Sequence, residues 1–213
     1  MGTSAAMVQL KVVKAGGAGS PADMKCSEIL ACFDPPIEFG THSQMQGTKD
    51  GYQAEHILPT SAMHDLGRAG DKFAGCEGYS TGGALTFMAG DGQKEGFEHK
   101  ILTDQMRKFS QANDVKVPPR NAPMKEWLKE YKEGAKAALD KGLPHRTINR
   151  TDLDRDSLIE QAAECIVLAA KESFGKLDPP VTEDTPLRNP WKATQEQVQA
   201  AARQLGRRSA PPP

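Results

Sequence analysis

The sequence lacks several features that would assign the protein to a class at once. It has no run of 18 apolar residues, so we expect no membrane-spanning helix. Lys11 and Lys14 interrupt the apolar residues near its start, so no signal-peptide core is visible. Positive charge is not in excess, because 27 Lys and Arg face 28 Asp and Glu. A uniformly basic surface for nucleic acid is thereby excluded, whereas a local basic groove is not.

Cysteine is also scarce, with four residues at irregular spacing and no C-x-x-C pair. This pattern disfavours both a zinc knuckle and a disulfide framework. The sequence therefore predicts reduced thiols in a cytosolic fold. The alternatives are a bridge between Cys26 and Cys32, or a cysteine site that includes His42.

Familiar catalytic motifs are missing as well. The pair Glu55-His56 is followed by Ile57-Leu58-Pro59 and not by the second histidine of a zincin helix. No G-x-S-x-G nucleophile elbow, no G-x-G-x-x-G after a strand and no phosphate-binding P-loop occurs. These absences argue against zincin proteases, α/β-hydrolases and nucleotide-binding enzymes.

The order of apolar and turn-forming residues predicts an α+β, helix-rich protein with a small hairpin core. From residue 99 onward, apolar residues recur at helical spacing, and prolines or N-capping residues mark where helices begin. We expect helices at 99–111, 123–142, about 152–174 and, more weakly, 194–205. The expected organisation is a flexible linker at 1–25, a core at 26–111, a helical part at 112–178 packed on that core, and an extended tail at 179–213 that includes the weak helix.

Two short stretches organise the rest of the chain. Residues 51–59 read as a strand ended by a proline, and they place Glu55 beside His56. After a glycine-rich excursion, residues 96–100 open a helix that carries His99. A strand followed by a helix that brings back a histidine suits a small metal site for phosphodiester cleavage.

These stretches resemble the HNH/endonuclease VII superfamily of ββα-metal nucleases, in the branch that forms toxin domains of interbacterial effectors. The matching residues are Ala54-Glu55-His56-Ile57-Leu58-Pro59 and Glu98-His99-Lys100. The resemblance covers about residues 50–110, with residues 79–88 as the expected second strand of the hairpin. The usual middle asparagine is absent, because no Asn occurs between Thr48 and Gln111.

The resemblance implies a role for each residue of the motif. His56 would be the general base that takes a proton from water. Glu55 and His99 would hold one divalent ion, Mg²⁺ before Mn²⁺ or Zn²⁺, although Glu55 could instead orient His56. His64 is a candidate further ligand, or else an exposed residue at a helix start. The candidate contacts to nucleic-acid phosphate are Arg68, Lys72, Lys100 and Arg107.

Three further residues near these motifs are expected to have no part in the chemistry. Glu98 would interact with the dipole of the helix that it opens. His42 and His145 have no motif around them, and we expect both at the surface.

The expected function is a metal-dependent endonuclease toxin that cleaves nucleic acid, DNA before RNA. It would be made in the cytoplasm, exported by a secretion apparatus such as type VI or on a carrier protein, and delivered to the cytoplasm of a target bacterium. The resemblance also implies a cognate immunity protein, and its candidate contacts are Arg68, Lys72, Lys94, Lys100, Arg107 and Lys108. The alternatives are an RNase of the same fold and a non-catalytic helical interaction or adaptor protein.

Overall fold

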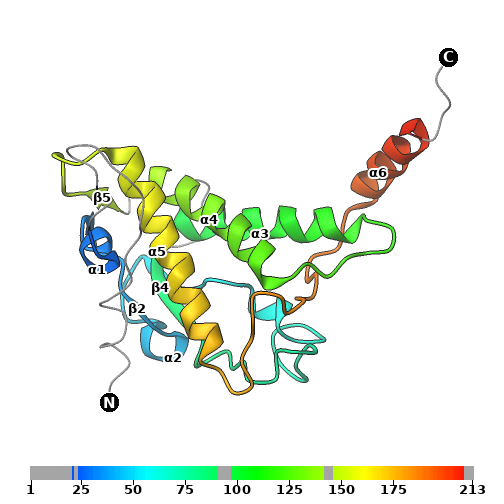
Figure 1. The fold of residues 1–213 in the computed structure, drawn as a ribbon, viewed down its shortest axis with the longest axis horizontal. Coiled ribbons are helices and arrows are strands. Elements are labelled where there is room, and N and C mark those ends of the chain that lie inside the picture. The colour runs from blue at the N-terminus through cyan, green and yellow to red at the C-terminus, as the bar shows by residue number, and fades with distance from the viewer. Residues whose placement is uncertain (1–20, 22–23, 91–96, 142–145, 209–213) are drawn as a thin grey trace.

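The main sheet of the computed structural model is antiparallel and has three strands (Figure 1). Its central strand is β4 (Leu85–Gly90), which lies between β2 (Phe39–Thr41) and β3 (Tyr52–His56). The structure describes residues 21, 24–90, 97–141 and 146–208, with side chains up to residue 203. The expected antiparallel pair is therefore present, but its second strand, predicted at 79–88, is Leu85–Gly90. A long loop that includes the short 3-10 helix η3 (Thr60–Ala62) separates β3 from β4.

The register of the sheet brings the ends of β2 and β3 to the same end of β4. His56, the last residue of β3, pairs with Thr86, while Thr41, the last residue of β2, pairs with Leu85. Thr86 is fully buried, and its hydroxyl donates a hydrogen bond of 3.2 Å to the Gly40 carbonyl of β2. Chain segments that leave β2 and β3 therefore start close together.

Three long helices complete the body of the protein. α3 (Glu98–Asp114) follows β4 and gives a ββα arrangement, and α4 (Met124–Lys141) packs between α3 and α5 (Arg155–Gly175). α3 and α4 approach closely at Gly134, where an added Cβ would lie 3.2 Å from Gln105 Cβ. The three predicted helices are confirmed, because each carries the apolar face that helical periodicity indicates.

The apolar faces of α4 and α5 form the centre of a continuous core. Their largest fully buried side chains are Met124, Trp127, Leu128, Tyr131, Leu158 and Ile166. Burial of one large apolar side chain contributes about 1.5–3 kcal/mol to folding, so these helices are held by the core and not only by local propensity. α5 begins as its sequence predicts, since the Asp154 carboxylate accepts a hydrogen bond of 2.8 Å from the Ser157 amide.

Short elements surround this body. α1 (Cys26–Leu30) packs against α5, β1 (Phe33–Asp34) pairs with β5 (Thr147–Ile148), and α2 (His42–Met45) follows β2 directly. The segment 26–50, which the sequence leaves as irregular, is thus built of elements of two to five residues. Elements this short give no periodic signal in a sequence.

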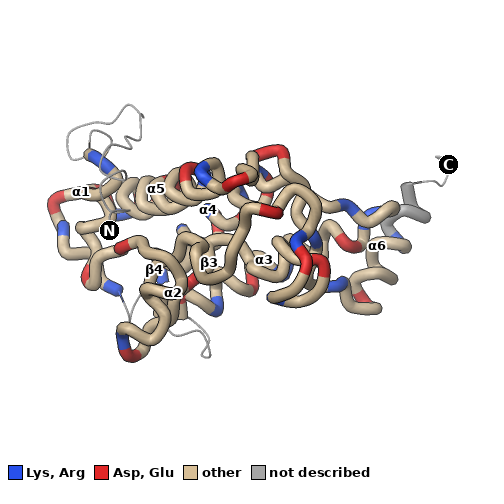
Figure 2. Tube along the Cα trace, turned by 90° about the horizontal axis from the view of Figure 1, so that it is seen from below, with Lys and Arg blue, Asp and Glu red and all other residues tan. Residues whose placement is uncertain are grey.

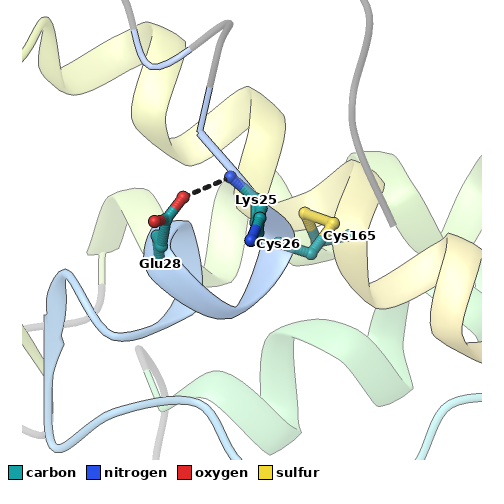
Figure 3. Close-up of a disulfide and its surroundings, with 4 residues drawn as sticks. All are labelled: Lys25, Cys26, Glu28 and Cys165. Carbon is teal, nitrogen blue, oxygen red and sulfur yellow. Dashed lines mark hydrogen bonds between the residues drawn. A yellow bond between two sulfur atoms is a disulfide. The ribbon is translucent and has the colours of Figure 1, made fainter. Parts of the chain in front are cut away.

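A disulfide joins α1 to α5 (Figure 3). Cys26 pairs with Cys165 across 139 residues of sequence, while Cys32 and Cys76 are free and buried. The prediction of four reduced thiols is therefore wrong, and so is the alternative bridge between Cys26 and Cys32. The close-up also shows α1 beginning at the disulfide, where the Lys25 amide donates a hydrogen bond to the Glu28 carboxylate.

The segment after α5 corrects the predicted tail at 179–213. Val181 and Leu187 are fully buried, and the Arg188 guanidinium donates hydrogen bonds of 2.6 Å to the carbonyls of Ser61 and His64. Up to residue 193 this segment is thus part of the folded body. The helix predicted at 194–205 is confirmed as α6 (Gln195–Arg208), which projects away from the body in Figure 1.

The expected α+β, helix-rich fold is confirmed by these elements. Lys and Arg are interspersed with Asp and Glu along the chain, as expected for a net charge of −1 (Figure 2). Within the described residues, no helix is long and apolar enough to cross a membrane. Most of the predicted linker at 1–25, the contact residue Lys94 and His145 lie outside the described residues.

Candidate active site

Glu55 and His99 meet where β3 ends and α3 begins. Glu55 stands opposite Phe87 in the sheet, and His99 is the second residue of α3. His99 Nδ1 donates a hydrogen bond to Glu55 Oε2. The Glu55 side chain is 7% exposed and that of His99 is 30% exposed, so the pair is open to solvent on the histidine side. Burial raises the pKa of the Glu55 carboxyl, while the hydrogen bond and charge of His99 act in the opposite direction.

A buried ion pair fixes the start of α3 and therefore the place of His99. Arg146 Nε donates a hydrogen bond of 2.8 Å to Glu98 Oε1, and both side chains are at most 2% exposed. The Gly90 amide at the end of β4 donates to Glu98 Oε2 at 2.9 Å, and Arg146 also donates to the Met88 carbonyl at 2.6 Å. Glu98 does stand in the first turn of α3 as predicted, but its main partner is this arginine.

His56 is the last residue of β3, next to Glu55 in the sequence but on the other face of the strand, and it is half-buried. Its Nε2 lies 3.3 Å from the Thr81 carbonyl oxygen. Because a carbonyl can only accept, Nε2 carries the hydrogen and Nδ1 keeps the lone pair. Burial lowers the pKa of His56 to about 4, against the opposing effect of the Thr81 hydrogen bond. The imidazole is therefore neutral at pH 7, with Nδ1 as the atom that can accept a proton.

His42 lies against the His56 ring, which the sequence did not indicate. The two ring centroids are 4.3 Å apart and the ring planes differ by 26°, so the imidazoles are stacked. His42 begins α2 and is half-buried. His42 was expected at the surface, and the structure places it there only in part, packed against the His56 ring.

Glu55 and His99 could hold a divalent ion where the ion takes the place of the hydrogen between Oε2 and Nδ1, because an N–H nitrogen has no lone pair for a metal. A carboxylate oxygen and an imidazole nitrogen lie together, with solvent on one side to supply water or phosphate oxygens. Such a sparse set suits Mg²⁺ or Mn²⁺ better than a structural zinc site, which is usually enclosed by four protein ligands. The hydroxyl of Thr103, one turn along α3, lies 3.4 Å from His99 Nε2 and gives the second ring nitrogen a partner.

His64 does not join this pair, although the sequence made it a candidate ligand. It is 1% exposed, its Nδ1 donates to the Thr60 carbonyl at 2.9 Å, and its Nε2 accepts from Lys72 Nζ at 2.7 Å. Throughout the described part of the chain, no group of three or more His, Cys, Asp and Glu side chains could hold a metal ion. His64 is thus buried with its own partners, Thr60 and Lys72, and is not part of the Glu55–His99 contact. The alternative of an exposed His64 is wrong.

The four residues predicted to contact phosphate differ in whether they lie near the candidate site and in whether another side chain already binds them. Arg68 is exposed, and its charge acts on both Glu55 and His56, so it lies near the candidate site. Lys72 is bound to His64 instead. Lys100 pairs with Asp104 and remains partly exposed.

Arg107 continues along the exposed side of α3. Its guanidinium lies 3.2 Å from Asp104 and 5.9 Å from the centre of the Trp191 ring. Since residues 99, 103 and 107 are four apart, Arg107 lies on the same helix face as His99, about two turns away. Arg68 thus lies near the candidate site, Arg107 lies farther along α3 with Asp104 as partner, and Lys72 is engaged by His64.

Three groups that contact the candidate site residues were not predicted from the sequence, and a sequence pattern indicates only one of them. The Thr81 carbonyl is backbone, and Arg146 lies 48 residues beyond its partner Glu98. Thr41-His42-Ser43-Gln44, by contrast, has the pattern of a capping box, and the Thr41 amide does donate to Gln44 Oε1 at 3.2 Å. That pattern indicates a helix beginning at His42.

Comparison with known proteins adds no relative. No family model matches the chain, and neither a curated protein nor a solved structure is similar to it.

Proposed function

We propose that the chain is a metal-dependent endonuclease that hydrolyses phosphodiester bonds of nucleic acid, most of all DNA. The observation that carries this proposal is the contact of Glu55 with His99 at the end of β3, the strand that ends in His56. His99 lies 44 positions beyond Glu55, yet the two side chains are hydrogen-bonded, and the neutral imidazole of His56 follows Glu55 at the end of the same strand.

Glu55 and His99 would hold the divalent ion, and His56 would act as the base. A bound divalent ion neutralises charge on the phosphate oxygens and on the departing 3′ oxygen. His56 Nδ1 takes the proton of the attacking water, because the Thr81 carbonyl holds the hydrogen on Nε2. Glu98 and Arg146 keep α3 at the end of β4, so that His99 stays beside Glu55.

Substrate binding would use local rather than overall positive charge. The net charge of −1 gives no general attraction for nucleic acid, so a few placed cations must act near the site. Arg68 beside Glu55 and His56, and Arg107 on the His99 face of α3, are the best-placed candidates. Neither contact distinguishes DNA from RNA, because recognition of RNA depends on its 2′-OH groups.

The disulfide supports the proposal that the chain is delivered from one cell to another. Disulfides persist in oxidising compartments and are rare in reducing cytosol. A chain with a Cys26–Cys165 bridge is therefore suited to a route outside the producer's cytoplasm. We extend the proposal to a secreted interbacterial toxin, carried by a secretion apparatus or carrier protein and neutralised in the producer by an immunity protein.

The alternative function, a non-catalytic adaptor that binds a partner protein through its helices, has little exposed apolar surface to support it. The apolar faces of α4 and α5 are buried in the core, so these two helices have no apolar face left for a partner protein. Among the described residues, the large apolar side chains that are exposed are Leu66, Val117 and Val198, on three separate segments. Partner binding through a helix would depend on α6, where Val198 is 50% exposed.

The direct test is cleavage of supercoiled plasmid DNA by the purified chain with Mg²⁺, Mn²⁺ or Zn²⁺ and with chelator. We expect nicking that needs the metal and that His56→Ala reduces by at least about a hundredfold, since general base catalysis contributes about 10²–10⁴-fold. Lys129→Ala, on the exposed side of α4, is the matched control and should cleave like the wild type. A parallel assay with structured RNA decides between the two substrates. Equal cleavage by wild type and His56→Ala would contradict the proposal.

A further inference from the structure

The stack between His42 and His56 gives the candidate site a component outside the ββα unit. We propose that His42 is a positioning residue, whose ring holds the His56 imidazole in the orientation that presents Nδ1 to the attacking water. This inference rests on the proposed nuclease function and deepens it. His42 would act through the face of its ring, 4.3 Å from that of His56, and not through contact with the substrate.

His42 is itself held firmly by the chain that leads into β4. Its amide donates a hydrogen bond of 3.0 Å to the Ala84 carbonyl. The amide and hydroxyl of the next residue, Ser43, both donate to the Gly82 carbonyl at 3.0 Å. A Cβ at Gly82 would lie 2.5 Å from Ser43 Oγ, so that hydroxyl would have to turn away from its present position. The start of α2 is thus fixed on residues 82–84.

The same stretch of chain also holds His56. Thr81, directly before Gly82, supplies the carbonyl that accepts from His56 Nε2 at 3.3 Å. Residues 81–84 therefore position both rings. They contact the edge of the His56 ring directly, and they hold the His42 ring through hydrogen bonds to the His42 backbone. The relative position of the two imidazoles is determined by one short segment.

The stack on His42 and the hydrogen bond to the Thr81 carbonyl restrict the His56 ring in different ways. A histidine ring turns about its last side-chain torsion with broad, roughly two-fold preferences. Stacking on His42 confines the ring to one plane, which leaves two orientations related by a half-turn. The half-turn would replace Nε2 by a carbon at the Thr81 carbonyl, so the hydrogen bond selects one of the two. Removal of the stack would leave a single hydrogen bond to hold the ring, and Nδ1 would lose its fixed direction.

The activity test uses three substitutions of His42. His42→Ala and His42→Leu remove the flat ring, and Leu keeps comparable bulk so that at least one folded variant is obtained. His42→Phe keeps a flat ring without a nitrogen. We expect kcat for plasmid cleavage to fall by about ten- to a hundredfold in the Ala and Leu variants, with KM nearly unchanged, because misplacement of a catalytic group costs up to about 10²-fold. His42→Phe should recover most of kcat.

Two results would overturn the inference. Full activity in the folded Ala or Leu variant means that the stack has no role. Activity in His42→Phe as low as in the Ala variant means that a ring nitrogen is needed, as for a residue that touches the substrate. Thermal unfolding of each variant, measured on the same preparation as the cleavage assay, identifies any loss of activity that comes from misfolding alone.

A second readout does not depend on cleavage. ¹⁵N NMR of the histidine rings reports which nitrogen of His56 carries the hydrogen. We expect a single Nε2–H form in the wild type and in His42→Phe, and averaged or broadened ring signals in His42→Ala. If the wild type cleaves neither DNA nor RNA with any of the three metals, the proposed function fails, and this spectrum still tests the positioning. An unchanged His56 spectrum in His42→Ala would overturn it.

Discussion

Arg146 and Glu98 form an ion pair that is shielded from solvent and ties the segment after α4 to the first residue of α3. The guanidinium also donates to backbone carbonyls of Pro35 and Met88, so its removal leaves several buried acceptors without a donor. Glu98 directly precedes His99 in the sequence. Stability and placement of the candidate metal ligand therefore depend on the same contact.

We predict that Arg146→Ala lowers the free energy of unfolding by about 3–5 kcal/mol, because it leaves the Glu98 carboxylate buried and unpaired. Urea denaturation at pH 7 measures this change. Arg150→Ala is the control, since it breaks the pair of Arg150 with Asp152 at the surface and should change stability little. Similar values for the two variants would show that the buried pair is not the anchor that its geometry indicates.

The metal proposal predicts that Glu55→Gln and His99→Gln each weaken binding of Mg²⁺ or Mn²⁺ by more than about tenfold, because each removes one of two protein ligands. Isothermal titration calorimetry gives the affinities, and circular dichroism verifies that the fold is kept. Asp104→Asn, which removes a carboxylate from the same helix, should bind like the wild type. If His99→Gln alone weakens binding, Glu55 is an orienting residue and not a ligand.

The disulfide predicts a stability that depends on redox conditions. Closing a loop between residues 139 apart stabilises by up to about 5 kcal/mol in the chain-entropy model, which treats the bond as a constraint on the unfolded chain. We expect dithiothreitol, or Cys26→Ser, to lower the melting temperature markedly. Cys76→Ser serves as control, because that thiol is free, and its melting temperature should still fall on reduction. No effect of reductant on the wild type would contradict the bridge.

Lys132 and Lys136 of α4 hold Glu160 of α5 between them, each with a nitrogen 2.6 Å from the carboxylate. Their hydrogen bonds and charges lower the pKa of Glu160 to about 2. A depressed folded pKa stabilises the protein above the unfolded pKa of 4.5, and that contribution is lost as pH falls from 4.5 toward 2.

We therefore predict that Glu160→Gln is less stable than the wild type by about 0.5–1 kcal/mol at pH 7, a modest value because the group is partly exposed. The difference should shrink as pH falls from 5 to about 2. Urea titrations at a series of pH values measure it. A difference that stays constant down to pH 2 would mean that the charge of Glu160 does not contribute.

Local patterns in the sequence were enough to predict the long helices, and they also mark the two elements that carry Glu55 and His99. α3, α4 and α5 follow from apolar periodicity and from capping residues such as Asp154, which act within a few residues of chain. The resemblance implied that Glu55 and His99 lie together, and each stands near the end of an element that the local pattern indicates.

The features that the sequence did not predict depend on contacts between distant segments. Cys26 and Cys165 have no shared pattern, and spacing cannot reveal which cysteines meet. Val181 and Leu187 are buried singly among prolines and polar residues, so the segment looked like a tail. His64 was attractive as a ligand by residue type, but its surroundings use both ring nitrogens.

The toxin proposal makes a prediction in living cells. A nuclease with a complete site attacks the DNA of the cell that makes it, unless an inhibitor occupies the site. We predict that expression of the wild-type chain in the cytoplasm of a bacterium without an immunity protein stops growth and fragments the chromosome. His56→Ala, which removes the base but keeps Glu55, His99 and their anchors, should restore growth.

The comparison depends on equal amounts of soluble, folded protein, which immunoblotting and purification from the same cultures establish. Lys129→Ala should be as toxic as the wild type, because it changes only an exposed side chain of α4. Reducing cytoplasm opposes formation of the Cys26–Cys165 bridge, so the same experiment in a strain with oxidising cytoplasm should raise toxicity. Equal growth with wild type and His56→Ala in both strains would count against a nuclease toxin and leave the exposed helix α6, as a partner-binding element, to explain the protein.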